Sequence, residues 1–141
     1  MGNGERMVEF EKAAADLDCI FTGRLPYNRM CGMLSACDIA VNPIIHNATQ
    51  SIINKTGDYA AAGLPVINTQ ECQEYRDLVD EYHMGINCRN SDAMDVSMAI
   101  EHLVEDEHLR MKMAGNARRC AEERFDRTLR YMALERAIIG V

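Results

Sequence analysis

The chain has 141 residues, of which 48% are hydrophobic and 26% charged, and its formal net charge is -7 at pH 7. These values describe a globular protein that is long enough to bury a substantial apolar core. The acidic balance argues against sequence-independent binding of nucleic acid or anionic lipid, because both require a basic face that only a local patch would supply here.

The first two thirds of the chain alternate short apolar runs with helical segments. The expected helices cover residues 6–16, 27–36, 51–62 and 74–80, and the expected strands cover 19–21, 39–41, 65–68 and 85–87. Strands separated by helices of this length imply right-handed crossovers and a parallel sheet that is covered on both faces. The pattern therefore predicts an open, Rossmann-like α/β fold.

The last third reads as a helical tail. We expect helices over 91–104, with Ser91 and Asp92 at its start, over 107 to about 123, and over 126–139. No linker rich in Gly, Ser or Pro interrupts the chain, so we expect one domain over residues 1–141. The opening Gly2–Gly4 turn leads into a helix with no strand before it, which predicts a domain truncated at its N-terminus.

The cysteines and histidines do not suggest a disulfide framework or a metal centre. The chain has six cysteines but no close CxxC pair, and we expect reduced, mostly buried thiols in a cytoplasmic protein. His46 and His83 have no Cys, Asp or second His at ligand spacing, so we expect no metal. No apolar run approaches the roughly 20 residues that a membrane span requires.

Two loops after strands are candidates for ligand binding. In an open parallel sheet, ligands bind where the strands end and the following helices begin. These loops are residues 22–28 and 42–50, and the second leads into the helix expected near Ser51. The free N–H groups of that helix start suit a phosphate, with Thr49, Gln50 and Ser51 as its expected contacts.

Asp58 is the acidic residue of interest in this region. It lies seven residues beyond Ser51, on about the same helical face as Ser51 and Asn54. A carboxylate at that place can accept two hydrogen bonds from a ribose diol, but a solvated or capping surface acid remains open. Lys55 and Arg24 are candidate phosphate contacts, although a solvated cation is the plainer interpretation of each.

Two longer stretches resemble a known enzyme family. They are "FTGRLPYNRMCGMLSACDIAVNP" and "QSIINKTGDYAAAGLPVI", the latter followed by "ECQEYRDLV" and "HMGINC". Together they resemble the C-terminal, nucleotide-sugar-binding half of retaining glycosyltransferases of the group 1 or family 4 type. These enzymes have the GT-B fold, with two Rossmann-like domains, and include bacterial polysaccharide enzymes.

The resemblance assigns roles to particular residues. The family motif, two Glu separated by seven residues, falls on Gln50 and Asp58. In the family the first acid lies near the donor sugar and its phosphates, and the second holds the ribose hydroxyls. Asp58 keeps the charge on a side chain one methylene shorter, whereas Gln50 loses it, which puts the first role in doubt.

The resemblance also implies contacts around these two positions. Backbone groups of Ser51, Ile52 and Ile53 would face the sugar and phosphates, and Gly23 and Arg24 would border the base. The Arg and Lys that neutralise the departing diphosphate in the family lie upstream of Gly2, as does the acceptor-binding domain. We therefore expect the isolated chain to be inactive as a transferase.

The resemblance thus implies a glycosyltransferase that acts on a glycan or lipid-linked acceptor without metal or cofactor. By family frequency the donor is a UDP sugar, and the full-length protein would be cytoplasmic, with a possible place at the inner face of the membrane. Two alternatives remain open. One is a nucleotide-sugar epimerase of the same fold, and the other is a non-catalytic binding or interaction module, which Gln50 mildly favours.

The end of the chain predicts self-association. The stretch from Phe125 carries an apolar series of Leu129, Met132, Ile138 and Ile139. Uncovered apolar stripes and sheet edges tend to find partners, so we expect a homodimer or higher species. A monomer whose tail folds back over its own sheet remains the alternative.

Overall fold

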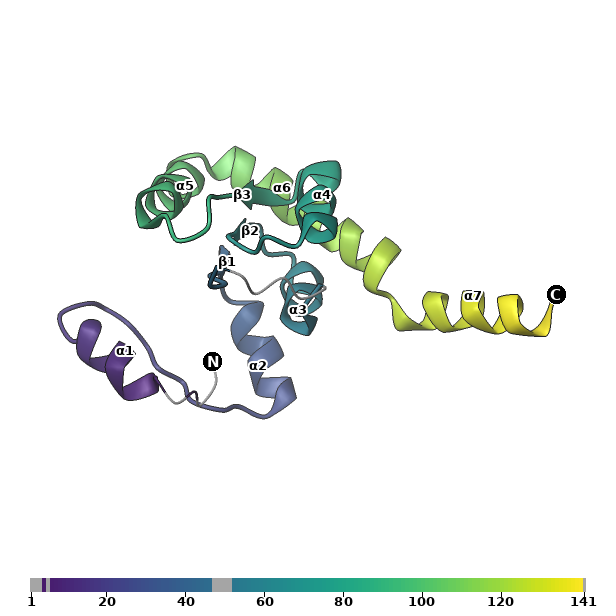
Figure 1. Ribbon diagram of the computed structural model, residues 1–141, viewed down its shortest axis with the longest axis horizontal. Helices are drawn as coiled ribbons and strands as arrows, with labels where there is room; N and C mark the ends of the chain where they lie inside the picture. The colour runs from purple at the N-terminus through teal and green to yellow at the C-terminus, as the bar shows by residue number, and fades with distance from the viewer. Residues whose placement is uncertain (1–3, 5, 47–51, 141) are drawn as a thin grey trace.

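The computed structural model describes residue 4 and residues 6–46 and 52–140 (Figure 1). The elements in chain order are α1 (Met7–Ala13), α2 (Tyr27–Leu34), β1 (Ala40–Asn42), α3 (Asn54–Ala61), β2 (Val66–Asn68), α4 (Gln73–Tyr82), β3 (Gly85–Asn87), α5 (Ala93–Glu105), α6 (Glu107–Cys120), the π-helical turn η1 (Ala121–Phe125) and α7 (Arg127–Ile139). The alternation of strands and helices followed by a helical tail is confirmed.

The sheet is parallel and has three strands in the order β1-β2-β3. Its register aligns Ala40 with Val66 and Gly85, and the last residues of the three strands, Asn42 and Asn68 and Asn87, with one another. Successive residues of a strand point to opposite faces. The aligned positions therefore form rows across the sheet, with an asparagine row at its carboxyl edge.

Helices cover both faces of this sheet, as the sequence predicted. On the face of Val66, a core forms with Tyr75 and Val79 of α4 and with Ala117 and Cys120 of α6. On the opposite face, Ile67 packs in a cluster with Ala99 and Leu103 of α5. Figure 1 shows α5 on one side of the strands and α3 and α4 on the other. The structure is thus a Rossmann-like α/β arrangement with an open parallel sheet.

The strand expected over residues 19–21 is absent from the structure, so that prediction was wrong. Among the described residues this segment has no paired strand, and Ile20 is 83% exposed. It lines a cavity of about 880 Å³ together with Ile39 and with Val41 of β1, and in the described part of the chain β1 pairs only with β2. A segment with strand propensity forms a strand only when a neighbouring strand is available for pairing.

Helix α3 begins three residues later than the sequence predicted and ends one residue earlier, at Ala61. Ile53, with extended backbone angles, precedes the first helical residue, Asn54. The Thr56 hydroxyl donates to the Ile53 carbonyl at 2.6 Å, which tightens this start. At the other end Gly63 has a φ of +68°, the left-handed conformation that commonly terminates helices.

The cysteines are less buried than the sequence suggested. All six are free thiols; Cys88 and Cys120 are buried, Cys31 and Cys72 are half-buried, and Cys19 and Cys37 are exposed. Burial raises the pKa of the Cys120 thiol to about 11, so this group stays protonated. Within the described residues, no group of three or more His, Cys, Asp or Glu could hold a metal ion, and no helix is long and apolar enough to span a bilayer.

Candidate functional site

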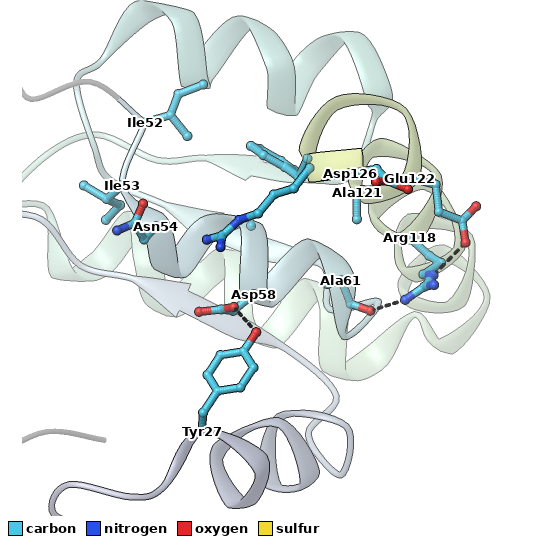
Figure 2. Close-up of a pocket in the computed structure, with 13 residues that line it drawn as sticks. Tyr27, Ile52, Ile53, Asn54, Asp58, Ala61, Arg118, Ala121, Glu122 and Asp126 are labelled. Atoms are coloured by element: carbon cyan, nitrogen blue, oxygen red, sulfur yellow. Dashed lines mark hydrogen bonds and ion pairs between the residues drawn. The ribbon is translucent and has the colours of Figure 1, made fainter. Parts of the chain in front are cut away.

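A cavity of about 860 Å³ lies where α3 meets the junction of α6, η1 and α7. Its walls come from the start of α2, the residues that lead into α3, one face of α3, and the segment from α6 to α7. Figure 2 shows its lining. The lining residues are Tyr27, Ile52, Ile53, Asn54, Gly57, Asp58, Ala61, Arg118, Ala121, Glu122, Phe125, Asp126 and Arg127.

One face of α3 supplies the floor of the cavity. Gly57, Asp58 and Ala61 lie three, four and seven residues after Asn54, which places the four residues on a single side of the helix. The other side is fixed by burial, because Thr56 and Ala60 lie in the interior. Packing of the buried side therefore fixes which face of α3, and hence which carboxylate, meets the cavity.

Asp58 is half-buried and has one hydrogen-bond partner among the described residues. The hydroxyl of Tyr27 donates to Asp58 Oδ1 at 3.2 Å, and Figure 2 shows the two side chains pointing toward each other. The neighbouring Cys31 side chain and the negative charge of Asp58 raise the pKa of Tyr27. Tyr27 therefore keeps its proton at neutral pH and acts as the donor.

Arg118 of α6 contacts other residues of the protein through both its Nε and its Nη1. Its Nη1 donates to the carbonyl of Ala61 at 2.7 Å, and its Nε pairs with Glu122 Oε1 at 2.8 Å. The first contact satisfies a carbonyl at the end of α3, which has no partner within its own helix. Arg118 thus joins the tail to α3 and holds the two walls of the cavity together.

Three residues predicted for the site come together at this cavity. Ile52, Ile53 and Asp58 all line it, so the start of α3 and the carboxylate one turn further on face the same space. Thr49, Gln50 and Ser51 lie outside the described residues. Whether they contribute to the same surface stays a prediction.

The other predicted positions lie elsewhere. Gly23 lines the second cavity, beside Cys19 and Phe21, and Arg24 is exposed without lining either of these two cavities. Lys55 of α3 is half-buried, and burial lowers its pKa. None of these three residues lines the cavity at Asp58.

Several residues of the cavity escaped the sequence reasoning. Ala61 shares a helical face with Asn54 and Asp58, so its spacing alone would have found it. No spacing pattern in the sequence indicates that Tyr27 and the tail residues Phe125 and Arg127 line the cavity. Their approach to α3 depends on packing between elements far apart in the chain. The π-helical turn that places Phe125 is of a kind often found at functional sites.

A polar network at the carboxyl ends of the strands was also missed. Asn42 Nδ2 donates to Asn68 Oδ1 at 3.0 Å, and Asn68 Nδ2 donates to Asn87 Oδ1 at 2.9 Å. Asn87 in turn donates to Asp80 Oδ1 at 2.8 Å. The endings "AVN", "VIN" and "GIN" of the three strands were the sequence signal for this ladder.

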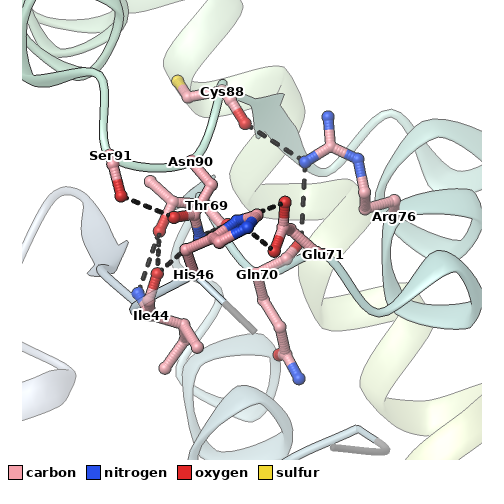
Figure 3. Close-up of polar contacts among 9 residues, drawn as sticks. All are labelled: Ile44, His46, Thr69, Gln70, Glu71, Arg76, Cys88, Asn90 and Ser91. Atoms are coloured by element: carbon pink, nitrogen blue, oxygen red, sulfur yellow. Dashed lines mark hydrogen bonds and ion pairs between the residues drawn. The ribbon is translucent and has the colours of Figure 1, made fainter. Parts of the chain in front are cut away.

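The loops beyond the ladder are tied to one another (Figure 3). Asn90 Nδ2 donates to the carbonyls of Ile44 at 2.7 Å and Thr69 at 2.8 Å, and the Ile44 N–H donates to Thr69 Oγ1 at 2.9 Å. His46 and Glu71 add an ion-pair contact of 3.1 Å when the histidine is protonated. These bonds fix the start of the loop that leads from β1 toward α3.

Comparison with known families identifies the chain. The family described as glycosyl transferases group 1 matches residues 1–106, which include all three strands, α3 and Asp58. The chain belongs to this family. No curated protein matches the sequence significantly.

The family assignment supports a glycosyltransferase function on a Rossmann-like scaffold. Its match ends within the junction between α5 and α6, so it covers the α3 wall of the cavity. The wall formed by Arg118, Phe125 and Arg127 lies beyond the matched residues. The residues within the family match and the residues of the tail therefore form different walls of the same cavity.

Proposed function

We propose that this chain is the nucleotide-sugar-binding, C-terminal domain of a retaining glycosyltransferase with the GT-B fold, and that the donor binds in the cavity at Asp58. The observation that carries the proposal is the placement of Asp58, Ile52 and Ile53 on one cavity in a chain of the glycosyl transferases group 1 family. The cavity of about 860 Å³ falls within the usual range for small-molecule sites.

The chemistry of the lining suits a nucleoside diphosphate. A carboxylate has about four acceptor positions on its two oxygens, so Asp58 can receive ribose hydroxyls while it still accepts from Tyr27. The amino end of α3 offers unpaired backbone N–H groups next to Ile53 and Asn54, which favour phosphate oxygens. Ribose and phosphate would then lie along one face of α3.

The remaining assignments follow from the family likeness. We infer a UDP sugar as donor, a glycan or lipid-linked acceptor, no metal or cofactor, and a cytoplasmic location, with a possible place at the inner face of the membrane. The acceptor would bind a second domain that these 141 residues do not contain. Helix amino ends and cationic side chains would stabilise the leaving diphosphate. Gln50 stands at the position of the first family acid.

A second candidate function is a non-catalytic binding module that has kept the fold. The observation in its favour is Gln50, which cannot supply the negative charge of the Glu that it replaces. Such a module would still bind nucleotide through Asp58 but would not transfer sugar when the rest of a family enzyme is supplied. A nucleotide-sugar epimerase of the same fold would instead interconvert donor sugars.

Titration of the ¹⁵N-labelled chain with UDP tests the proposed site. We expect saturable amide shifts at Ile52, Ile53, Asn54 and Asp58, with a dissociation constant of about 1 mM, because the single domain provides one wall of a donor cleft. Uridine should shift the Asp58 region but affect Asn54 less. A titration that moves none of these amides, or moves only residues around Gly23, would contradict the assignment.

Self-association is expected from the tail. Helix α7 projects from the domain (Figure 1), and every side chain on it that the structure describes is exposed. Leu134 and Ile138 are 55% and 75% exposed and lie one turn apart on one face. The side chain of Leu129 lies outside the described part. An uncovered apolar face of this kind favours pairing with a second copy.

Light scattering over a tenfold concentration range measures this association. We expect the average mass to rise with concentration and the double variant Leu134→Glu, Ile138→Glu to remain monomeric. The control variant Met94→Glu, Met98→Glu changes an equally exposed pair on α5, at 70% and 61% exposure, and should associate like the wild type. A constant monomer mass for the wild type would contradict the prediction.

A further inference from the structure

Tyr27 and Asp58 form a pair at the cavity although they are 31 residues apart in the chain. Tyr27 is the first residue of α2, and its side chain is 68% exposed, so its hydroxyl is open to a ligand. Asp58 comes from the middle of α3. The two side chains are brought together by a small core cluster in which Leu34 of α2 and Tyr59 of α3 pack with Ala40 and Leu64.

The hydrogen bond leaves both partners with acceptor capacity. Tyr27 uses its one proton on Asp58 Oδ1, so the phenolic oxygen keeps its lone pairs. Asp58 keeps Oδ2 and a second position on Oδ1. Two acceptors of different strength, a carboxylate and a phenol, therefore lie side by side at the edge of one cavity, and the bond between them restricts the rotation of the Asp58 side chain.

We propose that Tyr27 is a specificity-determining residue of the nucleotide site, which acts with Asp58 to recognise a vicinal diol. One ribose hydroxyl donates to Asp58, and the neighbouring hydroxyl donates to the oxygen of Tyr27, while Tyr27 continues to orient the carboxylate. The pair thereby favours ribonucleotides over deoxyribonucleotides. This inference rests on the proposed function, since it assigns a second contact to the same ligand.

The charges nearby are consistent with an acceptor role for Tyr27. Asp58 is the acid that Tyr27 contacts; of the two cations that line the cavity, Arg118 is held by Glu122 and the Ala61 carbonyl, and Arg127 belongs to the wall at the start of α7. The Cys31 side chain and the negative charge of Asp58 both raise the pKa of Tyr27, which keeps the proton on the phenol, and the geometry directs it at Asp58.

Replacement of Tyr27 by Phe provides the test, because Tyr27→Phe removes the hydroxyl and keeps the exposed ring. The full chain is titrated with UDP and with 2′-deoxy-UDP, and binding is followed by the amide shifts of α3. We expect the wild type to bind UDP roughly tenfold more tightly than 2′-deoxy-UDP, and Tyr27→Phe to lose about fivefold in UDP affinity while 2′-deoxy-UDP changes little. The discrimination between the two nucleotides should largely disappear.

A matched control and a second variant keep the result interpretable. Tyr131→Phe removes a hydroxyl from an equally exposed tyrosine on α7 and should leave both affinities unchanged. In combination with Asp58→Asn, the Tyr27→Phe change should cost less than it does alone, because the two side chains act on the same diol.

The outcomes separate the inference from the proposed function. No UDP binding by the wild type would contradict the proposed function itself. UDP binding that is unchanged or tighter in Tyr27→Phe would overturn only the role of Tyr27, since a hydroxyl that merely occupies Asp58 would compete with the ligand. Unfolding curves of each variant establish that any loss of affinity arises in the folded domain.

Discussion

Gly85→Ala is expected to lower the free energy of unfolding by about 3 kcal/mol, at the upper end of the cost of overpacking a well-packed interior. Gly85 begins β3 and lies opposite Val66 in the sheet register. A Cβ at this position would lie 2.1 Å from the Val66 carbonyl oxygen and 2.7 Å from its Cγ1. Because the first of these atoms belongs to the backbone, relief requires β2 and β3 to move apart.

Thermal unfolding followed by circular dichroism measures this effect. We expect the midpoint to fall by about 10 °C for a domain of this size. Gly115→Ala is the control, because Gly115 lies in α6 with no atom within 4 Å of the added Cβ. An alanine there should stabilise the helix by about 0.5 to 1 kcal/mol. Equal stability of Gly85→Ala and wild type would show that β3 does not pair at this register.

Asp58→Ala is expected to weaken nucleotide binding by about 1.5 to 3 kcal/mol, the range for hydrogen bonds to a charged group. The variant removes the carboxylate that faces the cavity and leaves the hydroxyl of Tyr27 without its acceptor. Asp58→Glu keeps the charge and should be much milder, since it restores the side-chain length of the family motif. The fold should persist in both, because Asp58 is half-buried at the surface of α3.

Calorimetry or NMR titration with UDP compares these variants with the wild type. The control is Asp77→Ala, which removes a carboxylate on α4 that pairs only with Gln73 in the described part of the chain. It should bind nucleotide like the wild type. Equal affinity of Asp58→Ala and wild type for UDP would end the proposal that this carboxylate holds the ribose.

Part of the site was predictable from the sequence because it depends on one helix. The spacing of Asn54 and Asp58 and the stop at Gly63 are local features, and the structure keeps both. The start of the helix at Asn54 was not predicted, since the residue before it, Ile53, is apolar and makes no side-chain cap, whereas Ser51 offers a better capping residue. Helix propensity and residue spacing therefore predicted the helix and its exposed face, but the predicted first residue lies three positions before the observed one.

The parallel α/β sheet also followed from the sequence, whereas the strand over residues 19–21 did not form. The central strands are flanked by helices and rich in apolar residues, so their burial follows from composition and order. The segment at Ile20 is also apolar, but among the described residues it has no paired strand, and Ile20 is 83% exposed. Composition can identify a segment that is able to pair, and only the tertiary structure decides whether a partner lies beside it.

The sequence by itself determined the alternation of strands and helices, the covering of both sheet faces, and the face of α3 that carries Asp58. Each of these properties follows from the spacing of apolar and polar residues within a single helix or strand, and it needs no knowledge of distant residues. The tertiary structure alone decided that Tyr27 meets Asp58, that Arg118 joins the tail to Ala61, and that three strand-end asparagines form a ladder. Each of these contacts joins residues far apart in the chain, so their geometry depends on how whole elements pack rather than on any local pattern.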